Sequence, residues 1–428
     1  MVAPTVEGGD HGVLEELFRR GELQVLQTPL VEIESGAPVA VRLLTHGLAG
    51  TAVIPPARLQ TLVAASQHAV TLDEAARARA LSEVRIAPLL AGAPVVLDAH
   101  LASFTQLLPN DAGTDVILLV DSSDVLARPS EMLRLVAAAR GEGWEIGLRE
   151  VGSTVDSLTA VSVLEPALVV LSPRVLEEPT SRLSVETVQA TTAFCHSSGA
   201  LLAVDGVTDP TTVAAAVAVG ATLVSGPLYG QVALARGEAP EPLLRRFAAP
   251  PPVSHQSPFE LASRRHPARR ATKPMLVALS KRLEAVAEPA GRSSVVLAAF
   301  QTAEQFTPAT AVRYRRLAER CTLVMAAAQG LEHTTTPNLS VAALDPSDPL
   351  VHEWNVLVLA PTMSVMLTAS DARVPARRDE ERAFDYLLTY DRDLVAHAAR
   401  SMLGRLTHRA GGVGPGCGRT AAGPAGRE

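Results

Sequence analysis

The strongest constraint on this chain is a repeated alternation of short apolar runs with amphipathic stretches between residues 12 and 235. The apolar runs have the length of strands, and the stretches between them carry apolar residues at helical spacing. The predicted strands are Leu23–Ile33, Val39–Leu44, Pro94–Leu97, Val116–Val120, Glu145–Leu148, Leu168–Leu171, Leu201–Val204 and Thr222–Val224. The predicted helices are Pro56–Ala69, Leu72–Leu90, Pro129–Arg140, Thr154–Leu164, Val185–Ser197 and Pro210–Val219. Eight such units favour an α/β fold of the (β/α)8 TIM barrel type, with an open doubly wound sheet as the alternative.

The segment 236–272 interrupts this alternation and is predicted to be a linker. It contains the proline run Pro250–Pro252, which stiffens the backbone, and a basic cluster follows. The basic residues of this cluster are Arg264, Arg265, His266, Arg269, Arg270 and Lys273. A solvated face of the linker is the favoured interpretation, and docking of a nucleic acid or a partner is the alternative.

A second periodic region, residues 273–408, predicts a smaller mixed α/β domain. Its predicted strands are Ser294–Ala299, Thr322–Ala326, Val341–Ala343, Val356–Leu359 and Val365–Thr368. Its predicted helices are Met275–Val286, Pro308–Glu319, Asp379–Leu388 and Asp391–Leu406. Tyr314 and Phe384 are expected to be core aromatic residues rather than part of a cofactor site. The ends of the chain, residues 1–11 and 409–428, are expected to be disordered.

Charge and composition exclude several classes of function. Residues 1–250 carry 28 acidic and 16 basic side chains, a balance of −12, so this part has no electrostatic reason to bind nucleic acid or an anionic membrane. No uninterrupted apolar run reaches the ~18 residues of a membrane span. The first ten residues lack the pattern of a signal peptide, and the three cysteines have no metal-binding spacing. These features together indicate a cytoplasmic protein.

Lysine is almost absent from the chain. Of 38 basic residues, only Lys273 and Lys281 are lysine, so 36 are arginine. Arginine is effectively never deprotonated, and the first 250 residues therefore cannot supply a catalytic amine. Any enzyme family that needs a lysine in that part of the chain is excluded.

Four segments of the first module resemble the EAL domain, the barrel family that hydrolyses the bacterial second messenger cyclic di-GMP. They are Leu26–Val31, Trp144–Gly152, Leu164–Ser172 and Ala200–Thr208, and Ala221–Pro227 follows as the family's closing segment. The resemblance covers residues 12–235 and implies a TIM barrel. In active family members, carboxylates hold Mg²⁺ or Mn²⁺, which generates the attacking hydroxide.

The positions that match the family's metal ligands carry other residues here. Arg42 stands where the motif that names the family has its glutamate, and Arg149–Glu150 stand where the family has paired aspartates. Val170 replaces the family's lysine, and Asp205 replaces a glutamate. An arginine beside a metal site repels the cation. We therefore expect a degenerate site with no catalytic residue, no bound metal and no cofactor.

The pocket residues that remain are Gln27, Arg42, Arg149, Glu150 and Asp205. The favoured interpretation is that Arg42 and Arg149 form salt bridges with Glu150 and Asp205 and fill the pocket. The two arginines could instead bind the phosphates of cyclic di-GMP. A third alternative is a metal site rebuilt from Asp121, Asp124, Glu150 and Asp205.

The second module resembles the DICT domain, a sensory module found beside signalling domains. The matching segments are Val295–Thr310, Arg313–Ala318, Leu344–Val358, Arg382–Phe384 and Leu388–Val395. The two resemblances imply a non-catalytic, cytoplasmic regulator that responds to a small-molecule signal or a protein partner. An active phosphodiesterase and a cyclic di-GMP-binding effector are the alternatives. EAL barrels often form homodimers through the loop that matches Ser153–Ser157. This loop lacks the family's second glycine, so the resemblance allows a homodimer but does not require one.

Overall fold

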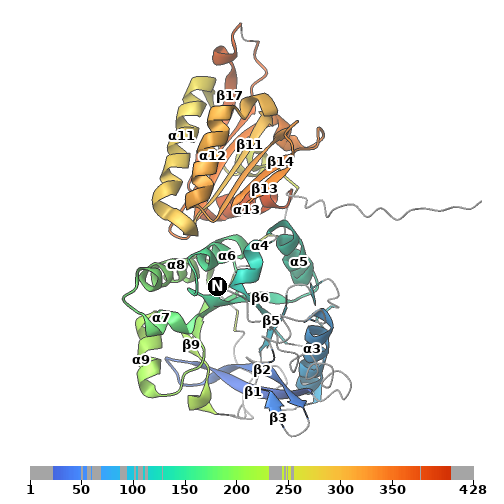
Figure 1. The fold of residues 1–428 in the computed structure, drawn as a ribbon, viewed down its shortest axis with the longest axis vertical. Coiled ribbons are helices and arrows are strands. Elements are labelled where there is room, and N and C mark those ends of the chain that lie inside the picture. Colours follow the sequence, from blue (N-terminus) through green and yellow to red (C-terminus); the bar gives the residue numbers. More distant parts are fainter. Residues whose placement is uncertain are drawn as a thin grey trace, which may run out of the picture.

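The computed structural model describes two bodies stacked along the long axis of the molecule (Figure 1). Its described residues are 23–49, 52–54, 59, 69–86, 94–100, 103–104, 109–110, 114–127, 129–230, 243–244, 247, 249–251, 255–375 and 377–405. The predictions for residues 1–11 and 409–428, and nearly all of the predicted helix Pro56–Ala69, lie outside this part of the chain.

The first body is a closed barrel of eight strands, as predicted. Its strands are β1 (Leu23–Glu32), β2 (Pro38–Ala49), β4 (Val95–Asp98), β5 (Val116–Asp121), β6 (Glu145–Val151), β7 (Leu168–Leu171), β8 (Leu201–Val204) and β9 (Leu223–Val224). They are hydrogen-bonded in the order β1-β9-β8-β7-β6-β5-β4-β2, and pairing of β1 with β2 closes the circle. A short strand, β3 (Ala52–Ile54), extends β2. Each of the eight predicted strands overlaps one strand of the closed circle.

One strand departs from the parallel arrangement that the alternation predicted. Strand β1 runs antiparallel to both of its neighbours, β2 and β9. The cause is the short connection between β1 and β2, since residues 33–37 are too few for the crossover that parallel strands need. The remaining neighbours in the circle, from β2 through β4 to β9, pair in parallel.

Helices pack around the barrel where the sequence predicted them, with two short additions. The helices are α3 (Ala69–Ile86), α4 (Ser122–Ala127), α5 (Pro129–Gly141), α6 (Asp156–Leu164), α7 (Pro173–Glu177), α8 (Arg182–Ser198) and α9 (Pro210–Ala218). The short helices α4 and α7 follow directly on strand ends and were not predicted. The one-turn helix η2 (Pro227–Tyr229) ends the described part of the barrel.

The second body is built on an eight-stranded mixed sheet. Its strands are β10 (Arg269–Thr272), β11 (Val295–Thr302), β12 (Leu323–Gln329), β13 (Thr334–Thr336), β14 (Leu339–Ala343), β15 (Glu353–Ala360), β16 (Met363–Asp371) and β17 (Ala383–Thr389). The order across the sheet is β10-β17-β16-β15-β11-β12-β14-β13. Within this second sheet, the only parallel pairs among the described strands are β11–β12 and β12–β14.

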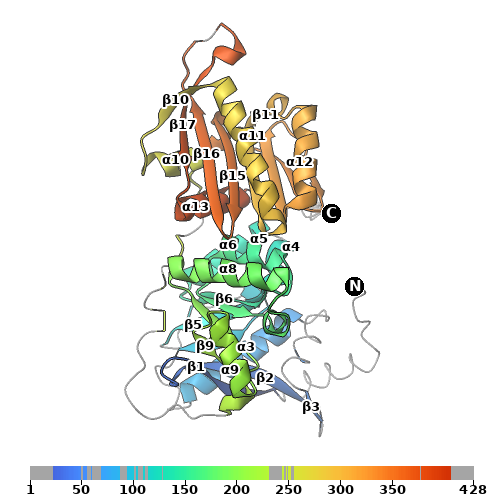
Figure 2. The ribbon, with the colours of Figure 1, turned by 90° about the vertical axis from the view of Figure 1, so that its left-hand side faces the viewer.

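Helices cover both faces of this sheet. They are α10 (Pro258–Ser263), α11 (Lys273–Ala290), α12 (Pro308–Arg320) and α13 (Arg392–Leu403), with single turns η3 (Gly291–Ser293), η4 (Ala303–Gln305), η5 (Pro349–His352) and η6 (Asp379–Glu381). Helices α11 and α12 lie side by side over one face, and α10 and α13 pack against the other (Figures 1 and 2). Tyr314, on α12, and Phe384, on β17, are fully buried between these helices and the sheet, as predicted for core aromatic residues.

Two predictions in this region are wrong. The predicted helix Asp379–Leu388 is instead the single turn η6 followed by strand β17. Alternate residues of β17 pack into opposite faces of the sheet, and pairing with β16 and β10 overrides the helix-forming tendency of the charged residues before it. The predicted linker 236–272 also contains α10 and β10, so its part from residue 258 onward belongs to the second body.

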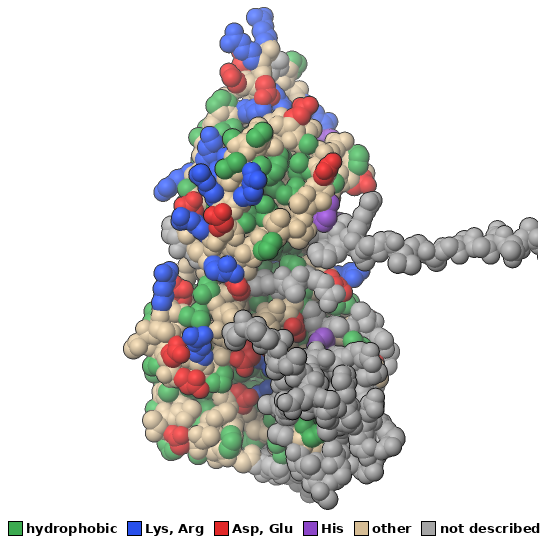
Figure 3. Space-filling model, viewed as in Figure 1, with side chains coloured by type: hydrophobic (Ala, Val, Ile, Leu, Met, Phe, Trp, Pro, Cys, Tyr) green, Lys and Arg blue, Asp and Glu red, His purple; other side chains and the backbone are tan. Residues whose placement is uncertain are grey.

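Three of the six residues of the basic cluster form ion pairs with carboxylates of the second body. Arg270 forms an ion pair with Asp385, Arg265 with Asp391, and Lys273 with Asp379. On the face drawn in Figure 3, basic and acidic side chains are interspersed. These pairs agree with the interpretation of the cluster as a solvated face. No helix in the described part of the chain is long and apolar enough to cross a membrane.

Candidate functional site

Strand alternation places one layer of polar side chains at the mouth of the barrel. The barrel interior is filled by apolar residues, among them Ala40, Val96 and Ala203. Two residues further along each strand, the side chain again points inward, because successive residues face opposite sides of a sheet. The side chains placed in this layer are Arg42, Asp98, Asp121, Arg149, Ser172 and Asp205. Five strands therefore bring charged residues together at one end of the barrel.

Arg42 is the centre of this layer. Its Nη2 atom donates to both carboxylate oxygens of Asp98, at 3.0 and 3.1 Å, and its Nη1 atom donates to Asp205. Arg42 is 7% exposed. Burial alone would lower the pKa of the guanidinium, but the carboxylates of Asp98 and Asp205 outweigh burial and raise it. Arg42 is therefore a fixed positive charge between two carboxylates.

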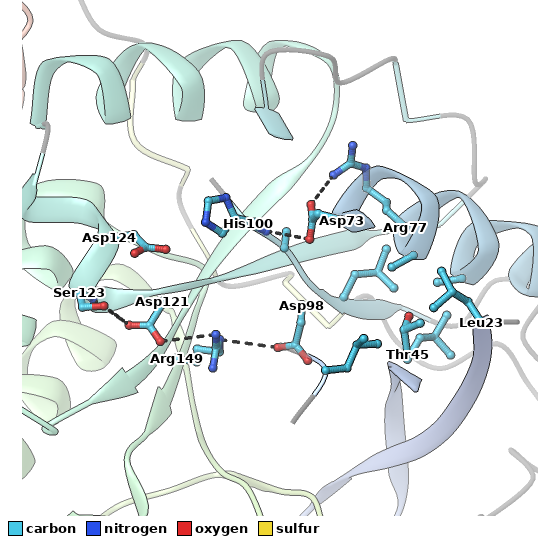
Figure 4. A pocket seen from close by; sticks show the side chains of 16 residues that line it. Leu23, Thr45, Asp73, Arg77, Asp98, His100, Asp121, Ser123, Asp124 and Arg149 are labelled. Atoms are coloured by element: carbon cyan, nitrogen blue, oxygen red, sulfur yellow. Dashed lines mark hydrogen bonds and ion pairs between the residues drawn. The ribbon is translucent and has the colours of Figure 1, made fainter. Parts of the chain in front are cut away.

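Arg149 extends the cluster to a third carboxylate. Its Nε lies 3.9 Å from Asp98 and its Nη2 lies 3.5 Å from Asp121. Figure 4 shows Arg149 between these two aspartates, with Asp121 also held by Ser123. Asp98 thus contacts both arginines. Two guanidinium groups and three carboxylates form one network, with a net charge of −1.

Glu150 lies outside this network because of a bulge in β6. The pairing of β6 with β7 shifts register between Leu148 and Val151, and Glu150 has a left-handed backbone with φ of 59°. The extra residue changes the direction of the side chains on either side of the bulge. The Glu150 carboxylate accepts a hydrogen bond of 2.8 Å from the Ser172 hydroxyl. No described cation pairs with Glu150.

Of the five pocket residues predicted from the sequence, three lie in the network, and two of these, Arg42 and Asp205, contact each other directly. Arg42, Arg149 and Asp205 belong to the network, but Glu150 bonds to Ser172. Gln27 pairs with Leu43 on the strand face that packs against the helices, so strand alternation directs it away from the barrel interior. The network also includes Asp98 and Asp121, which were not predicted as partners of the arginines. Their positions at strand ends were the available signal.

A cavity of about 290 Å³ lies beside the network, between the barrel mouth and α3. Its charged lining residues are Asp73, Arg77, Asp98, Asp121, Asp124 and Arg149. Burial raises the pKa of Asp73, which accepts hydrogen bonds from Ser103 and Arg77. Four carboxylates against two guanidinium groups make this cavity unfavourable for a ligand with two phosphates.

The residues at the mouth do not fit a divalent metal ion. The oxygen ligands that such an ion needs are engaged here, since Asp98, Asp121 and Asp205 each contact an arginine. Within the described residues, no group of three or more His, Cys, Asp or Glu side chains could hold a metal ion. Asp121, Asp124, Glu150 and Asp205 are not brought together as one such site.

Helix α6 joins the barrel to the second body. Every residue from Ser157 to Leu164 is buried, because one face of the helix packs on the barrel and the other face is covered by the second body. One apolar core runs from α6 into β11, β15 and α13. In both views, α6 and α13 face each other where the two bodies meet (Figures 1 and 2).

Polar contacts border this apolar interface. Asp156 accepts from Arg292 at 3.1 Å and from the Thr322 hydroxyl at 2.8 Å. At the other end of α6, Glu165 forms an ion pair with Arg400, which is 2% exposed. The loop Ser153–Ser157, through which EAL barrels were expected to pair, therefore lies beside an interface within the chain itself.

Comparison with protein families gives two matches that together cover most of the chain. The model described as "EAL domain" matches residues 12–232. The DICT model, described as "Sensory domain in DIguanylate Cyclases and Two-component system", matches residues 257–372. Among curated proteins, no sequence matches significantly.

Solved structures with a similar barrel include two FimX EAL domains bound to c-di-GMP. The domain from Xanthomonas citri is 16% identical with a TM-score of 0.43, covering 51% of this chain and 90% of its own. That from Pseudomonas aeruginosa is 15% identical with a TM-score of 0.41, covering 52% and 95%. The PaMucR phosphodiesterase in its c-di-GMP complex is 16% identical with a TM-score of 0.45, covering 53% and 98%. At these values, no conclusion about ligands passes to this chain.

Proposed function

Because the chain belongs to the EAL domain family, with a DICT sensory domain after the barrel, we propose that it is a non-catalytic regulator of cyclic di-GMP signalling. The observation that carries this proposal is the network at the barrel mouth. By the resemblance of its strand to the motif that names the family, Arg42 replaces a metal-binding glutamate, and its guanidinium is tied to Asp98 and Asp205. A second arginine, Arg149, ties Asp98 to Asp121.

The network opposes the two steps that hydrolysis needs, which are binding of a divalent cation and formation of a metal-bound hydroxide. A divalent cation would have to displace two guanidinium groups from their carboxylates, and each group repels it. The attacking hydroxide in this family is generated on such an ion, and the donor set here does not fit one. The lysine that active family members use is absent as well, since Val170 stands at its position and residues 1–250 contain no lysine.

Capture of cyclic di-GMP without hydrolysis is a weaker candidate. Its two phosphates would need exposed cations, but Arg42 is buried and both arginines already contact carboxylates. The adjoining cavity has more carboxylates than guanidinium groups. The barrel is better suited to act as a scaffold that receives a signal from the DICT domain across α6.

The shared core supports this transmission. Helix α6 has no exposed residue between Ser157 and Leu164, so a shift of the second sheet must move α6 or open the interface. A ligand changes such an equilibrium only if it binds the two states with different affinity. A protein partner that binds the barrel surface would then respond to the conformation of the DICT domain.

The decisive test is an assay of the purified full chain with cyclic di-GMP and Mg²⁺ or Mn²⁺. We expect no linear dinucleotide by chromatography, while an active EAL phosphodiesterase assayed in parallel gives complete conversion. Metal-dependent formation of the linear product, abolished by chelation, would refute the proposal.

Calorimetry then separates a scaffold from a nucleotide-binding effector. We expect no heat of binding when cyclic di-GMP is titrated into the wild-type chain or into Arg42→Ala. Saturable binding by the wild type that is weakened in Arg42→Ala would instead establish the effector. Circular dichroism of the variant controls for loss of fold.

A further inference from the structure

The second body contains a larger cavity than the barrel does. It has a volume of about 470 Å³ and lies between helices α11 and α12 and the sheet face that they cover. Its rim includes the exposed side chains of Lys281, Glu304 and Asp379, so it opens to solvent. This volume falls in the range of cavities that hold small organic ligands.

The floor of the cavity is aromatic and fixed in position. Phe300, Trp354 and Phe384 line it, and the rings of Trp354 and Phe384 meet edge to face with centroids 6.0 Å apart. The Trp354 indole donates a hydrogen bond of 3.1 Å to the buried Ser280 hydroxyl. A rigid aromatic floor favours a ligand with a planar, apolar body.

One end of the cavity is electrically balanced by the protein. Lys273 contacts Asp379 and donates to Gln305 at 3.1 Å. Arg382 forms ion pairs with Asp371 and Asp379. Glu304 adds an exposed negative charge on the rim at this end. No excess of positive charge is left here for a ligand.

The other end carries an uncompensated positive charge. The buried Glu284 accepts from Arg313 and from the Tyr314 hydroxyl, so the charges of Glu284 and Arg313 cancel. Lys281 also lines the cavity, and no described residue forms an ion pair with it. Eight residues of helix separate Lys281 from Lys273, a distance of about 12 Å at 1.5 Å per residue. The free ammonium is thus well removed from the acidic rim.

The use of lysine in this chain points to the same place. The sequence contains 38 basic residues of which two are lysine, and both of these line the cavity. Lysine offers a compact ammonium with three donors, whereas arginine presents a wide planar fork. The two positions that carry lysine thus present the more compact of the two cations to the cavity.

We propose that this cavity is the ligand site of the DICT domain and binds a small aromatic organic anion, such as an aromatic carboxylate. The planar body lies against Trp354, whose ring is backed by the buried Phe384, and the anionic group contacts the Lys281 ammonium. This inference names an input that the proposed function leaves open. It holds whether or not the barrel hydrolyses cyclic di-GMP.

The test is calorimetric titration of the full chain with 2-naphthoate, without nucleotide, beside its neutral analogue 2-naphthalenemethanol. Because a charge-assisted hydrogen bond is lost, we expect the neutral compound to bind about tenfold more weakly. Lys281→Met should weaken naphthoate binding by about the same factor. Arg282→Met, at the next and likewise exposed position of α11, should leave it unchanged.

The two tryptophans of the chain locate the bound probe. In the ¹⁵N spectrum, the indole resonance of Trp354 should shift on addition of naphthoate, while that of the buried Trp144 should not. A Trp144→Phe variant assigns the two signals. No heat with naphthoate, equal binding of the neutral analogue, an unchanged affinity in Lys281→Met or a stationary Trp354 resonance would each overturn the proposal. Since no nucleotide is present, such a failure leaves the proposed role of the barrel untouched.

Discussion

The barrel mouth and the second domain differ in how they accommodate their most buried charges. At the barrel mouth, Arg42, Asp98, Arg149 and their partners form a network in which Asp98 contacts both arginines. In the second domain, Lys273 and Arg382 share Asp379 at the cavity rim, but two deeply buried charges stand apart from any network of described residues. Arg400 relies on one carboxylate, and no described cation pairs with Glu353. A network can redistribute its contacts when one member is lost, but an isolated charge cannot. Mutations that affect Arg400 or Glu353 should therefore cost more stability than mutations in the network, even though the barrel mouth holds more charges.

The largest effect is expected when the Arg400 side chain loses Glu165, its one ion-pair partner among the described residues. Glu165→Ala leaves a guanidinium that is 2% exposed without a carboxylate, and its Nε and Nη2 atoms already have no hydrogen-bond partner. We expect a loss of about 4 kcal/mol in the free energy of unfolding, measured by urea denaturation. Arg292→Ala, which removes a more exposed pair at the same interface, should cost less than about 1 kcal/mol. Equal losses in the two variants would contradict the comparison.

The next effect is a pH dependence that originates at Glu353. This carboxylate accepts hydrogen bonds from Ser257, Phe259 and Asn355, but burial raises its pKa from 4.5 to about 7. The folded chain therefore holds this proton more tightly than the unfolded chain does. The contribution of Glu353 to stability is greatest below pH 4.5 and is lost as pH rises to about 7.

The change across this window should be on the order of 3 kcal/mol. Glu353→Gln keeps the shape of the side chain and removes the titration, so the difference in unfolding free energy between wild type and variant should vary with pH. Parallel stability curves for the two proteins between pH 5 and pH 8 would show that Glu353 does not titrate in this way.

A smaller effect is expected for Arg42 in the barrel network. In Arg42→Met, Asp98 keeps its contact with Arg149, and Asp205 has a side chain 39% exposed that water can solvate. We therefore expect a loss of about 2 kcal/mol, less than the full cost of stranding a buried charge. A loss as large as that of Glu165→Ala would show that the network does not compensate.

The smallest effect is expected for Arg149. Its ion-pair distances are 3.5 and 3.9 Å, and its side chain is 27% exposed. Such pairs contribute little because solvent screens them, so Arg149→Met should change the unfolding free energy by less than about 1 kcal/mol. In the double variant with Arg42→Met, however, Asp98 loses both cations, and the combined loss should exceed the sum of the single losses.

The sequence predicted the barrel well because its strands are short apolar runs between helical stretches. Leu168–Leu171 and Leu201–Val204 match strands β7 and β8 residue for residue. It was less informative where pairing decides the structure. Strand β17 was predicted as a helix because its neighbours, Asp379 and the glutamates after it, are typical of a helix start.

At the site, the sequence placed arginines at the mouth but did not predict all their partners. The contact of Arg42 with Asp205 was expected, whereas Glu150 was expected to pair and does not. A bulge shifts register by one residue and leaves no clear signal in a single sequence. The cavity near Lys281 has a counterpart in the sequence, since both lysines of the chain fall on α11. Their distribution alone indicates that the barrel has no lysine, but not that a cavity lies beside them.

The complete burial of α6 also bears on how such a chain is inherited. A barrel moved alone by recombination into another gene would carry an apolar helix with nothing to cover it. The transferred piece would gain solubility only by acquiring a new cover at the same face. The two domains of this chain are therefore expected to be exchanged together rather than separately, although each resembles a module that occurs in other proteins.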